Sequence, residues 1–487
     1  MIATNNFTNK VFDRLFVALL AIQVFAWRLP FIGTILTSDP AIRAYVSREI
    51  LEGSMPYRDV LNNKPPVILY AGALFSGLVN DPSLGYWLME AAFVAVAATV
   101  VFLAIRKNAD PLDAFVFTSL FVLFSNVSIF YYFTPGFIEY QAATFTALAY
   151  FLTLYGRRRS AHFVAGILVV LTLMSHQISV IACAPIWFWL AFHHRWRDLL
   201  YHFLGLLLSI GLVLAWFYRN AALDDLIYEA FSFGYFYFKA HPTELAEFRL
   251  PYLYYLLVPV PFLLVSIPWV IRRNKEYLLI LLWLLSAAAA LLLTGLRLYA
   301  HYFVILAAPM TLALANAWAA TNDRFSWIRG GQRFALAAAF FCFLAVTTAY
   351  SSREYFNRTN NRNSIANIEK FENPVLIEYI NDFPFAGKQR LVLYVGFGNP
   401  AVVALLTNTR MPKPYAYFGD FYDIPHPRQS DMTQRWIEEV KTNVPTLVVE
   451  DKRYFYSVPE TLSDWIKENY ELVNESGEFR VFAHRNR

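Results

Sequence analysis

The sequence predicts a polytopic α-helical membrane protein with a small α/β domain at its C-terminal end. Of its 487 residues, 57% are hydrophobic and only 16% are charged, whereas a soluble domain carries about 25% charged residues. Apolar runs of membrane-crossing length recur from the N-terminus to about residue 350. Beyond that point the runs stop, and short apolar stretches alternate with polar ones.

The apolar runs predict about eleven crossings, because a bilayer-spanning helix needs roughly 20 predominantly apolar residues. They lie at 11–31, 84–105, 113–131, 138–155, 161–175, 177–192, 199–218, 251–271, 277–294, 300–318 and 334–350. One further run, 65–80, is short and opens with Pro65 and Pro66, which suit the first turn of a helix.

The basic residues orient these helices, because cytoplasmic loops are enriched in Lys and Arg. If the run 65–80 crossed the membrane, the clusters at 106–107 and 157–159 would fall outside. If it does not cross and the N-terminus is cytoplasmic, every basic cluster falls inside. We therefore predict that 65–80 lies on the outer face, within a first outer loop at 32–83, and that the C-terminus is also outside.

The region 351–487 is predicted to be an extracytoplasmic α/β domain that follows a transmembrane domain at 1–350. The stretches "RLVLYVG" and "TLVVED" are typical of strands, and "DMTQRWIEEVKT" and "ETLSDWIKENY" are typical of helices. The stretch "YVGFGNP" lacks the GxGxxG fingerprint, so we expect no nucleotide site there. Cys183 and Cys342 lie inside apolar runs and are interpreted as packing residues.

This topology gathers charged residues on the outer face. Asp39 opens a helical pattern, "PAIRAYVSREILEG", that ends at Gly53. Lys64 directly precedes the short apolar helix, where a cation is disfavoured by the positive end of the helix dipole. Glu139 lies near membrane depth, where a carboxylate is costly unless it is paired or faces water. Further polar residues on this face are Asp59, His176, Arg219, Arg297 and His301.

Carboxylates beside cations suit a reaction on a lipid-linked anion. A carboxylate can act as general base toward an acceptor hydroxyl, and Arg or Lys can hold a phosphate and stabilise it as it leaves. A cation and a helix N-terminus both attract an anion, so Lys64 is interpreted as a phosphate-binding residue. Each residue also has a structural alternative. Asp39 could be only a helix cap, Lys64 and Arg297 ordinary interfacial residues, and His176 a turn residue.

The first outer loop, "SDPAIRAYVSREILEGSMPYRDVLNNKPPVILY", resembles that of the GT-C glycosyltransferases. The most similar branch includes the lipid A aminoarabinose transferase, the rhizobial galacturonic acid transferases and, more distantly, the protein O-mannosyltransferases. The positions that carry the resemblance are Asp39, Tyr45, Gly53, Pro56, Tyr57, Asp59, Lys64, Pro65 and Pro66. A second stretch, "GLRLYAHYFVILAAPM", is similar to a segment of the galacturonic acid transferase branch through Arg297, His301, Tyr302 and Pro309.

The resemblance implies a transferase that moves a sugar from a polyprenyl-phosphate donor to a glycan, lipid or protein hydroxyl. The reaction would take place on the outer face of a bacterial inner membrane. Asp39 and Glu139 would be catalytic, and Lys64, Arg297 and Arg219 would bind the donor phosphate. The substrate pocket would contain Tyr45, Tyr57, Asp59, His176, His301 and Tyr302.

Pro40 stands where this family often has a second acidic residue. The departure weakens a paired-carboxylate metal site, because divalent cations favour several oxygen ligands. We therefore expect transfer without a metal or other cofactor, although Asp39 and Glu139 could still hold a divalent cation. No nucleic-acid partner is expected.

A transporter or flippase of a lipid-linked sugar is the alternative. Many transporters have internal repeats and ionisable groups near the membrane midplane. The sequence has no duplicated halves, and its charged residues gather on one face, which favours the enzyme.

Overall fold

The computed structural model describes residues 2–32, 36, 39–132, 135–240, 275–294, 299–322, 374–385, 390–396, 400–413, 424–452 and 459–485. The chain forms two compact units. Unit 1 comprises Met1–Thr34, Tyr86–Trp216 and Thr243–Tyr355, and unit 2 comprises Ile35–Gly85, Phe217–Pro242 and Phe356–Arg487. The predicted domain boundary at 350/351 lies outside the described residues and stays a prediction.

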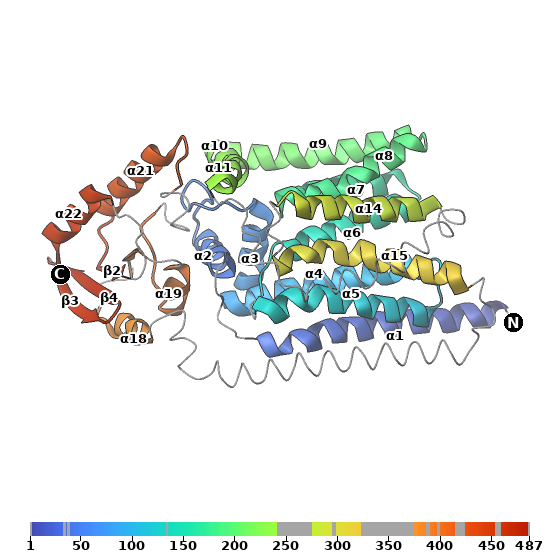
Figure 1. Ribbon diagram of the computed structural model, residues 1–487, viewed down its shortest axis with the longest axis horizontal. Coiled ribbons are helices and arrows are strands. Elements are labelled where there is room, and N and C mark those ends of the chain that lie inside the picture. The colour runs from blue at the N-terminus through green and yellow to red at the C-terminus, as the bar shows by residue number, and fades with distance from the viewer. Residues whose placement is uncertain are drawn as a thin grey trace. The chain divides into compact units, whose positions relative to one another are not determined.

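Unit 1 is helical (Figure 1). Its helices are α1 (Ile2–Arg28), α4 (Pro82–Ile105), α5 (Pro111–Tyr132), α6 (Glu139–Tyr155), α7 (Arg159–Leu173), α8 (Ala184–Phe192), α9 (Trp196–Arg219), α14 (Lys275–Leu292) and α15 (Val304–Asn322). Three short 3₁₀ stretches accompany them, at Leu29–Phe31, Gln177–Cys183 and Ala300–Phe303. Helix α5 packs against α1 and α15, and α6 packs against α7 and α15.

Small and aromatic side chains build the interior of unit 1. Tyr150 stacks on Trp283 with ring centroids 4.1 Å apart, and alanines fill much of the space between the helices. Helices α7 and α9 approach closely at Gly166, where an added Cβ would lie only 1.9 Å from the carbonyl oxygen of His202. Close approach through small residues is the usual way in which membrane helices pack.

Three of the described helical segments are long and apolar enough to cross a membrane, namely Pro82–Ile105, Trp196–Arg219 and His301–Ala319. Most other predicted crossings coincide with helices, but 177–192 is a 3₁₀ stretch followed by the nine-residue α8. The runs 251–271 and 334–350 lie outside the described residues. The count of eleven crossings therefore stays a prediction.

The first outer loop forms two helices of unit 2, α2 (Asp39–Leu51) and α3 (Pro66–Val79). Helix α2 ends in a Schellman motif: the Gly53 N–H donates to the Ile50 carbonyl and the Ser54 N–H to the Glu49 carbonyl. Gly53 has φ +91°, as the motif requires. Helix α3 begins at Pro66 and has 14 residues, a length of about 21 Å against a hydrocarbon core of about 30 Å.

Unit 2 also contains a mixed sheet with strand order β1-β2-β4-β3. Its strands are β1 (Val392–Val395), β2 (Leu447–Asp451), β3 (Tyr470–Ser476) and β4 (Phe479–His484). The accompanying helices are α18 (Pro374–Asp382), α19 (Pro400–Leu406), α21 (Gln429–Thr442) and α22 (Glu460–Asn469). Strands β1 and β2 and helices α21 and α22 confirm the predicted α/β pattern, whereas the β3–β4 hairpin was not predicted.

The loop after α9 also belongs to unit 2. It contains α10 (Leu223–Leu226), a π-helical turn at Ile227–Ser232 and α11 (Phe233–Ala240). A π-helical turn places its side chains differently from an α-helix and is frequent at functional sites. Here it carries the buried Glu229 toward the first outer loop, as described below.

Candidate active site

Asp39, Arg43 and Lys64 form a cluster in unit 2, called here the cation–carboxylate cluster. Asp39 begins α2, and Arg43 lies one turn later with its Nη1 atom 3.3 Å from Asp39 Oδ2. Lys64 Nζ lies 3.7 Å from the same oxygen. The Arg43 side chain is only 2% exposed, whereas those of Lys64 and Asp39 are 29% and 45% exposed. Two cations thus lie beside one carboxylate, and of the two only Lys64 is accessible.

The backbone of Lys64 is held on both sides. The Tyr57 hydroxyl donates to the Lys64 carbonyl at 2.8 Å, and the Lys64 N–H donates to Asn62 Oδ1 at 2.8 Å. The Asn62 N–H in turn donates to Glu229 Oε2 at 2.9 Å. Tyr57 is buried with φ +72°, and burial raises the pKa of its hydroxyl. Tyr57 is therefore placed to hold Lys64 through its hydroxyl.

The predicted pocket residues Tyr45 and Asp59 contact the protein backbone. The Tyr45 hydroxyl accepts the Met411 N–H at 2.9 Å, and its pKa is raised, chiefly by burial. Asp59 accepts the Met55 N–H at 2.8 Å and pairs with Arg58 at 2.7 Å. Burial opposes ionisation of Asp59, but the hydrogen bonds from Arg58 and Met55 outweigh it and lower the pKa.

Glu139, His176 and His301 form a second cluster, in unit 1, called here the carboxylate–imidazole cluster. Glu139 begins α6 and is 1% exposed. Its Oε1 atom lies 3.9 Å from His176 Nε2 and 3.8 Å from His301 Nε2. The ring of Tyr302 lies 4.5 Å from that of His301 and 5.9 Å from that of His176. Four predicted site residues from three distant segments are thus brought together.

Two neighbours orient the imidazoles of this cluster. His176 Nδ1 lies 2.7 Å from the Ser179 hydroxyl, and the His301 ring stacks on Phe137 with centroids 4.6 Å apart and an interplanar angle of 16°. Fixing one ring nitrogen decides which nitrogen remains for chemistry. The Nε2 atoms of both histidines are directed toward the Glu139 carboxylate.

Comparison with solved structures identifies the fold. No family profile and no curated protein sequence matches the chain. ArnT from Cupriavidus metallidurans bound to undecaprenyl phosphate aligns with a TM-score of 0.59 at 13% identity, over 96% of this chain and 97% of that chain. Apo ArnT aligns with a TM-score of 0.60 at 14% identity, over 99% and 98%.

A third structure is the archaeal oligosaccharyltransferase AglB from Archaeoglobus fulgidus, in complex with an inhibitory peptide and a dolichol phosphate. It aligns with a TM-score of 0.53 at 12% identity, over 98% of this chain and 74% of that chain. The chain has the GT-C glycosyltransferase fold. The resemblance seen in the first outer loop is thereby confirmed at the level of the fold.

Two residues predicted to bind donor phosphate in this GT-C fold are not in either cluster as described. Arg297 lies outside the described residues. Arg219 is the last residue of α9 and is exposed. Among the described residues, no group of three or more His, Cys, Asp or Glu side chains is arranged to hold a metal ion. The roles of Arg219 and Arg297 stay predictions.

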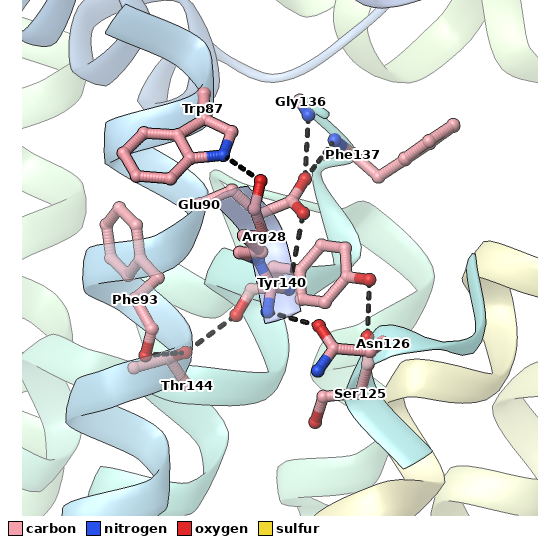
Figure 2. A network of polar contacts seen from close by, with 10 residues as sticks. All are labelled: Arg28, Trp87, Glu90, Phe93, Ser125, Asn126, Gly136, Phe137, Tyr140 and Thr144. Atoms are coloured by element: carbon pink, nitrogen blue, oxygen red, sulfur yellow. Dashed lines mark hydrogen bonds and ion pairs between the residues drawn. The ribbon is translucent and has the colours of Figure 1, made fainter. Parts of the chain in front are cut away.

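Sequence reasoning missed three buried ionisable residues. Glu229 lies in an aromatic-rich stretch, "LIYEAFSFGYFYF", of a predicted outer loop, and a single carboxyl group in so apolar a stretch was the available signal. Arg28 and Glu90 pair inside unit 1 at 3.3 Å and are 0% and 1% exposed (Figure 2). Both fall within predicted crossings, at 11–31 and 84–105, and a charge at such a position is a functional signal that could have found them.

Proposed function

We propose that the chain is an integral-membrane glycosyltransferase that moves a sugar from a polyprenyl-phosphate donor to an acceptor hydroxyl. The observation that carries the proposal is the cation–carboxylate cluster, in which Asp39 Oδ2 lies 3.3 Å from Arg43 and 3.7 Å from Lys64. ArnT and AglB were solved with undecaprenyl phosphate and dolichol phosphate respectively, and these ligands support a polyprenyl phosphate as the donor lipid.

Transfer begins as the acceptor oxygen attacks the anomeric carbon of the sugar. The bond between that carbon and the phosphate oxygen breaks, and its electron pair leaves with the polyprenyl phosphate. Asp39 takes the proton of the attacking hydroxyl as general base. Lys64 holds the departing phosphate and compensates the charge that develops on it. In-line attack of this kind inverts the anomeric configuration.

Arg43 and Lys64 differ in burial, and this difference suits two different roles. Arg43 is almost fully buried and belongs to the same helix as Asp39, so it stays beside the carboxylate. Lys64 is partly exposed on a flexible side chain, so it can turn from Asp39 to an arriving phosphate. When Lys64 turns away, Arg43 still compensates Asp39.

The carboxylate–imidazole cluster of unit 1 is proposed to bind a sugar. Glu139 offers an acceptor for sugar hydroxyls, and His176 and His301 can donate or accept according to their tautomers. The Tyr302 ring beside both imidazoles adds an apolar surface for a sugar face. Tyr45, Tyr57 and Asp59 support the first outer loop, and Arg297 and Arg219 are proposed as further phosphate contacts.

The reaction is proposed to take place on the outer face of a bacterial inner membrane, where the charge distribution puts the first outer loop and the C-terminal region. The acceptor is a hydroxyl of an envelope glycan, lipid or protein. The donor sugar is a hexose, a pentose or a derivative of either.

The test uses membranes that contain the full chain, supplied with vesicle-borne polyprenyl phosphates that carry radiolabelled sugars. Asp39→Asn should lower kcat roughly 100- to 10,000-fold, and Lys64→Ala should lower kcat/KM roughly 10- to 100-fold. Asp224→Asn and Lys441→Ala, at exposed positions of unit 2, serve as matched controls. If both site variants transfer sugar at the wild-type rate, the assignments fail. Translocation of the labelled lipid without a glycosylated product would instead support the flippase.

A further inference from the structure

A buried ion pair in unit 1 binds the segment that leads into Glu139. Glu90 Oε1 faces Arg28 Nη2 at 3.3 Å. Glu90 Oε2 accepts two successive backbone N–H groups, from Gly136 at 2.7 Å and from Phe137 at 3.3 Å. Figure 2 shows both N–H groups converging on this one oxygen. Charge-assisted bonds of this kind are stronger than neutral ones, so the carboxylate fixes the segment 135–138.

The backbone of the segment is shaped for this contact. Gly136 has φ +104°, a conformation that glycine adopts at little cost. Successive N–H groups that point to the same side form a small anion-binding concavity. In this chain the anion is a side chain of the protein itself. The contact therefore arranges the chain immediately before α6.

Arg28 is itself held by α4 and α5. The Trp87 indole N–H donates to the Arg28 carbonyl at 2.6 Å, and Arg28 Nη1 donates to Asn126 Oδ1. The guanidinium lies over the Tyr140 ring, with Cζ 5.2 Å from the centroid. Arg28 therefore cannot turn away from Glu90 without losing several contacts, and Glu90 keeps a fixed partner.

The fixed segment meets the carboxylate–imidazole cluster at two points. Phe137, whose N–H binds Glu90, stacks on the ring of His301. Glu139, two residues later, faces His301 and His176. A displacement of the 135–138 segment would move both the ring that orients His301 and the carboxylate that faces it.

We infer that Glu90, held by Arg28, is a positioning residue for sugar transfer that sets Glu139 and Phe137 against His301. This inference rests on the proposed function. A misplacement of about 1 Å at a reacting centre can lower a rate roughly 100-fold. Removal of the Glu90 acceptor should therefore lower kcat, because it displaces the cluster that is proposed to hold the sugar in its reacting position.

Single variants would be ambiguous, because Glu90→Gln leaves the Arg28 cation buried without its counter-ion and can prevent folding. Two double variants avoid this. Arg28→Met/Glu90→Gln removes both charges and keeps a carbonyl oxygen able to accept the two N–H groups. Arg28→Met/Glu90→Met removes both charges and also the acceptor. Gln and Met have similar volumes, so the two proteins differ mainly in that acceptor.

The control is Asp13→Asn, which breaks the ion pair between Asp13 and Arg106 (2.6 Å). Asp13 lies in α1 and Arg106 directly follows α4, so this pair joins the same two helices as Arg28 and Glu90. It lies about 22 Å along α1 from Arg28. The control should leave kcat unchanged, as expected of an ion pair that holds the helices without reaching the site.

Two quantities are measured on the full chain: kcat with the labelled donor vesicles, and hydrogen exchange of peptides that contain residues 136 and 137. The Met variant should exchange about tenfold or more faster than the Gln variant and should have at least about a tenfold lower kcat. Equal exchange and equal kcat in the two double variants would overturn the inference. If the wild-type chain transfers no sugar, the proposed function fails, and the exchange rates alone decide whether Glu90 fixes the segment.

Discussion

At the scale of single residues, Gly53 shows how one backbone angle supports the site. It closes the Schellman motif that ends α2, the helix that begins with Asp39. Its φ of +91° lies in the region that side-chain-bearing residues rarely adopt. In the turn that follows, the Tyr57 N–H donates to the Val60 carbonyl at 2.8 Å. The chain then continues to Lys64. The glycine thus helps to bring Lys64 back to the start of α2.

Gly53→Ala should lower the free energy of unfolding by about 1 kcal/mol, measured by thermal unfolding in detergent. The matched control is Gly211→Ala in α9. An added Cβ meets nothing within 4 Å at either position, and only Gly53 has a positive φ. The control should be neutral or slightly stabilising, since alanine is the better helix former. Equal losses in both variants would contradict the role of the backbone angle.

A second residue-scale prediction concerns Arg43. Arg43→Met removes the buried cation beside Asp39 and keeps the pair of Asp39 with Lys64. Lys64 would then be held at Asp39 when the phosphate arrives, so the KM for the donor lipid should rise several-fold. The conservative variant Arg43→Lys should restore most of the affinity because it restores the charge. A KM that is unchanged in Arg43→Met would show that Arg43 is not needed beside Asp39 when Lys64 binds the phosphate.

At the scale of elements, the π-helical turn at Ile227–Ser232 is hydrogen-bonded to the turn before α3. It carries Glu229, which is 2% exposed and accepts the Asn62 N–H. Burial is the largest cause that raises the pKa of Glu229 well above its ordinary value, and the Asn62 N–H opposes the rise. The carboxyl is therefore protonated in the folded chain over a wider pH range than in the unfolded chain.

The sign of the resulting pH dependence follows from this shift. Folding binds a proton at Glu229 between its unfolded and folded pKa values, so stability falls as the pH rises through that window. Glu229→Gln should therefore raise the melting temperature relative to wild type at pH 8, and the gain should vanish near pH 4. Glu229→Met lacks the acceptor and should be destabilised at both pH values. A pH-independent effect of the Gln substitution would contradict the assignment.

Local sequence patterns predicted the helix ends that depend on the backbone preferences of a single residue. The start of α3 at Pro66 and the end of α2 near Gly53 follow from the special backbone preferences of Pro and Gly. The hairpin β3–β4 was missed because β3 is polar and mostly exposed and has no clear period, although β4 alternates between buried and more exposed residues. The glycine at its turn, Gly477 with φ +46°, was the sequence signal that could have indicated the hairpin.

The sequence analysis named most residues of the two clusters, but it did not predict all of their contacts. Charge placement and the GT-C resemblance indicated Asp39, Lys64 and Glu139. The Asp39–Arg43 pair follows from the i,i+4 spacing within α2, whereas the Asp39–Lys64 pair depends on how α2 and α3 pack, which no local pattern encodes. Tyr45 and Tyr57 were expected to line a pocket, but their hydroxyl groups bind backbone atoms of the protein.

At the scale of the whole molecule, the first outer loop and the C-terminal region form parts of the same unit. Arg48 of α2 donates to the carbonyls of Ala404 and Thr409 at 3.3 and 2.6 Å. Arg410 pairs with the buried Glu49 and with Glu52 of the same loop. Most of these groups are partly or fully shielded from water, so the removal of one partner costs more free energy than it does in an exposed ion pair.

Arg410→Met should destabilise unit 2 by about 3 kcal/mol or more, because Glu49 is left buried without its cation. Sugar transfer should fall in the same variant, since α2 carries Asp39. Arg480→Met, which removes an ion pair on the exposed face of the β3–β4 hairpin, should change neither property. Thermal unfolding and transfer assays on the full chain measure both. Wild-type stability of Arg410→Met would refute the coupling.

The contacts of Arg48 and Arg410 have a consequence for chimeric proteins with this fold. An exchange of the C-terminal region alone would pair a foreign α19 segment with this chain's Arg48, Glu49 and Glu52. The foreign segment would then need, by chance, carbonyl groups at the positions of Ala404 and Thr409 and a cation at the position of Arg410. Residues 35–85, 217–242 and 356–487 should therefore be exchanged together, as one cassette.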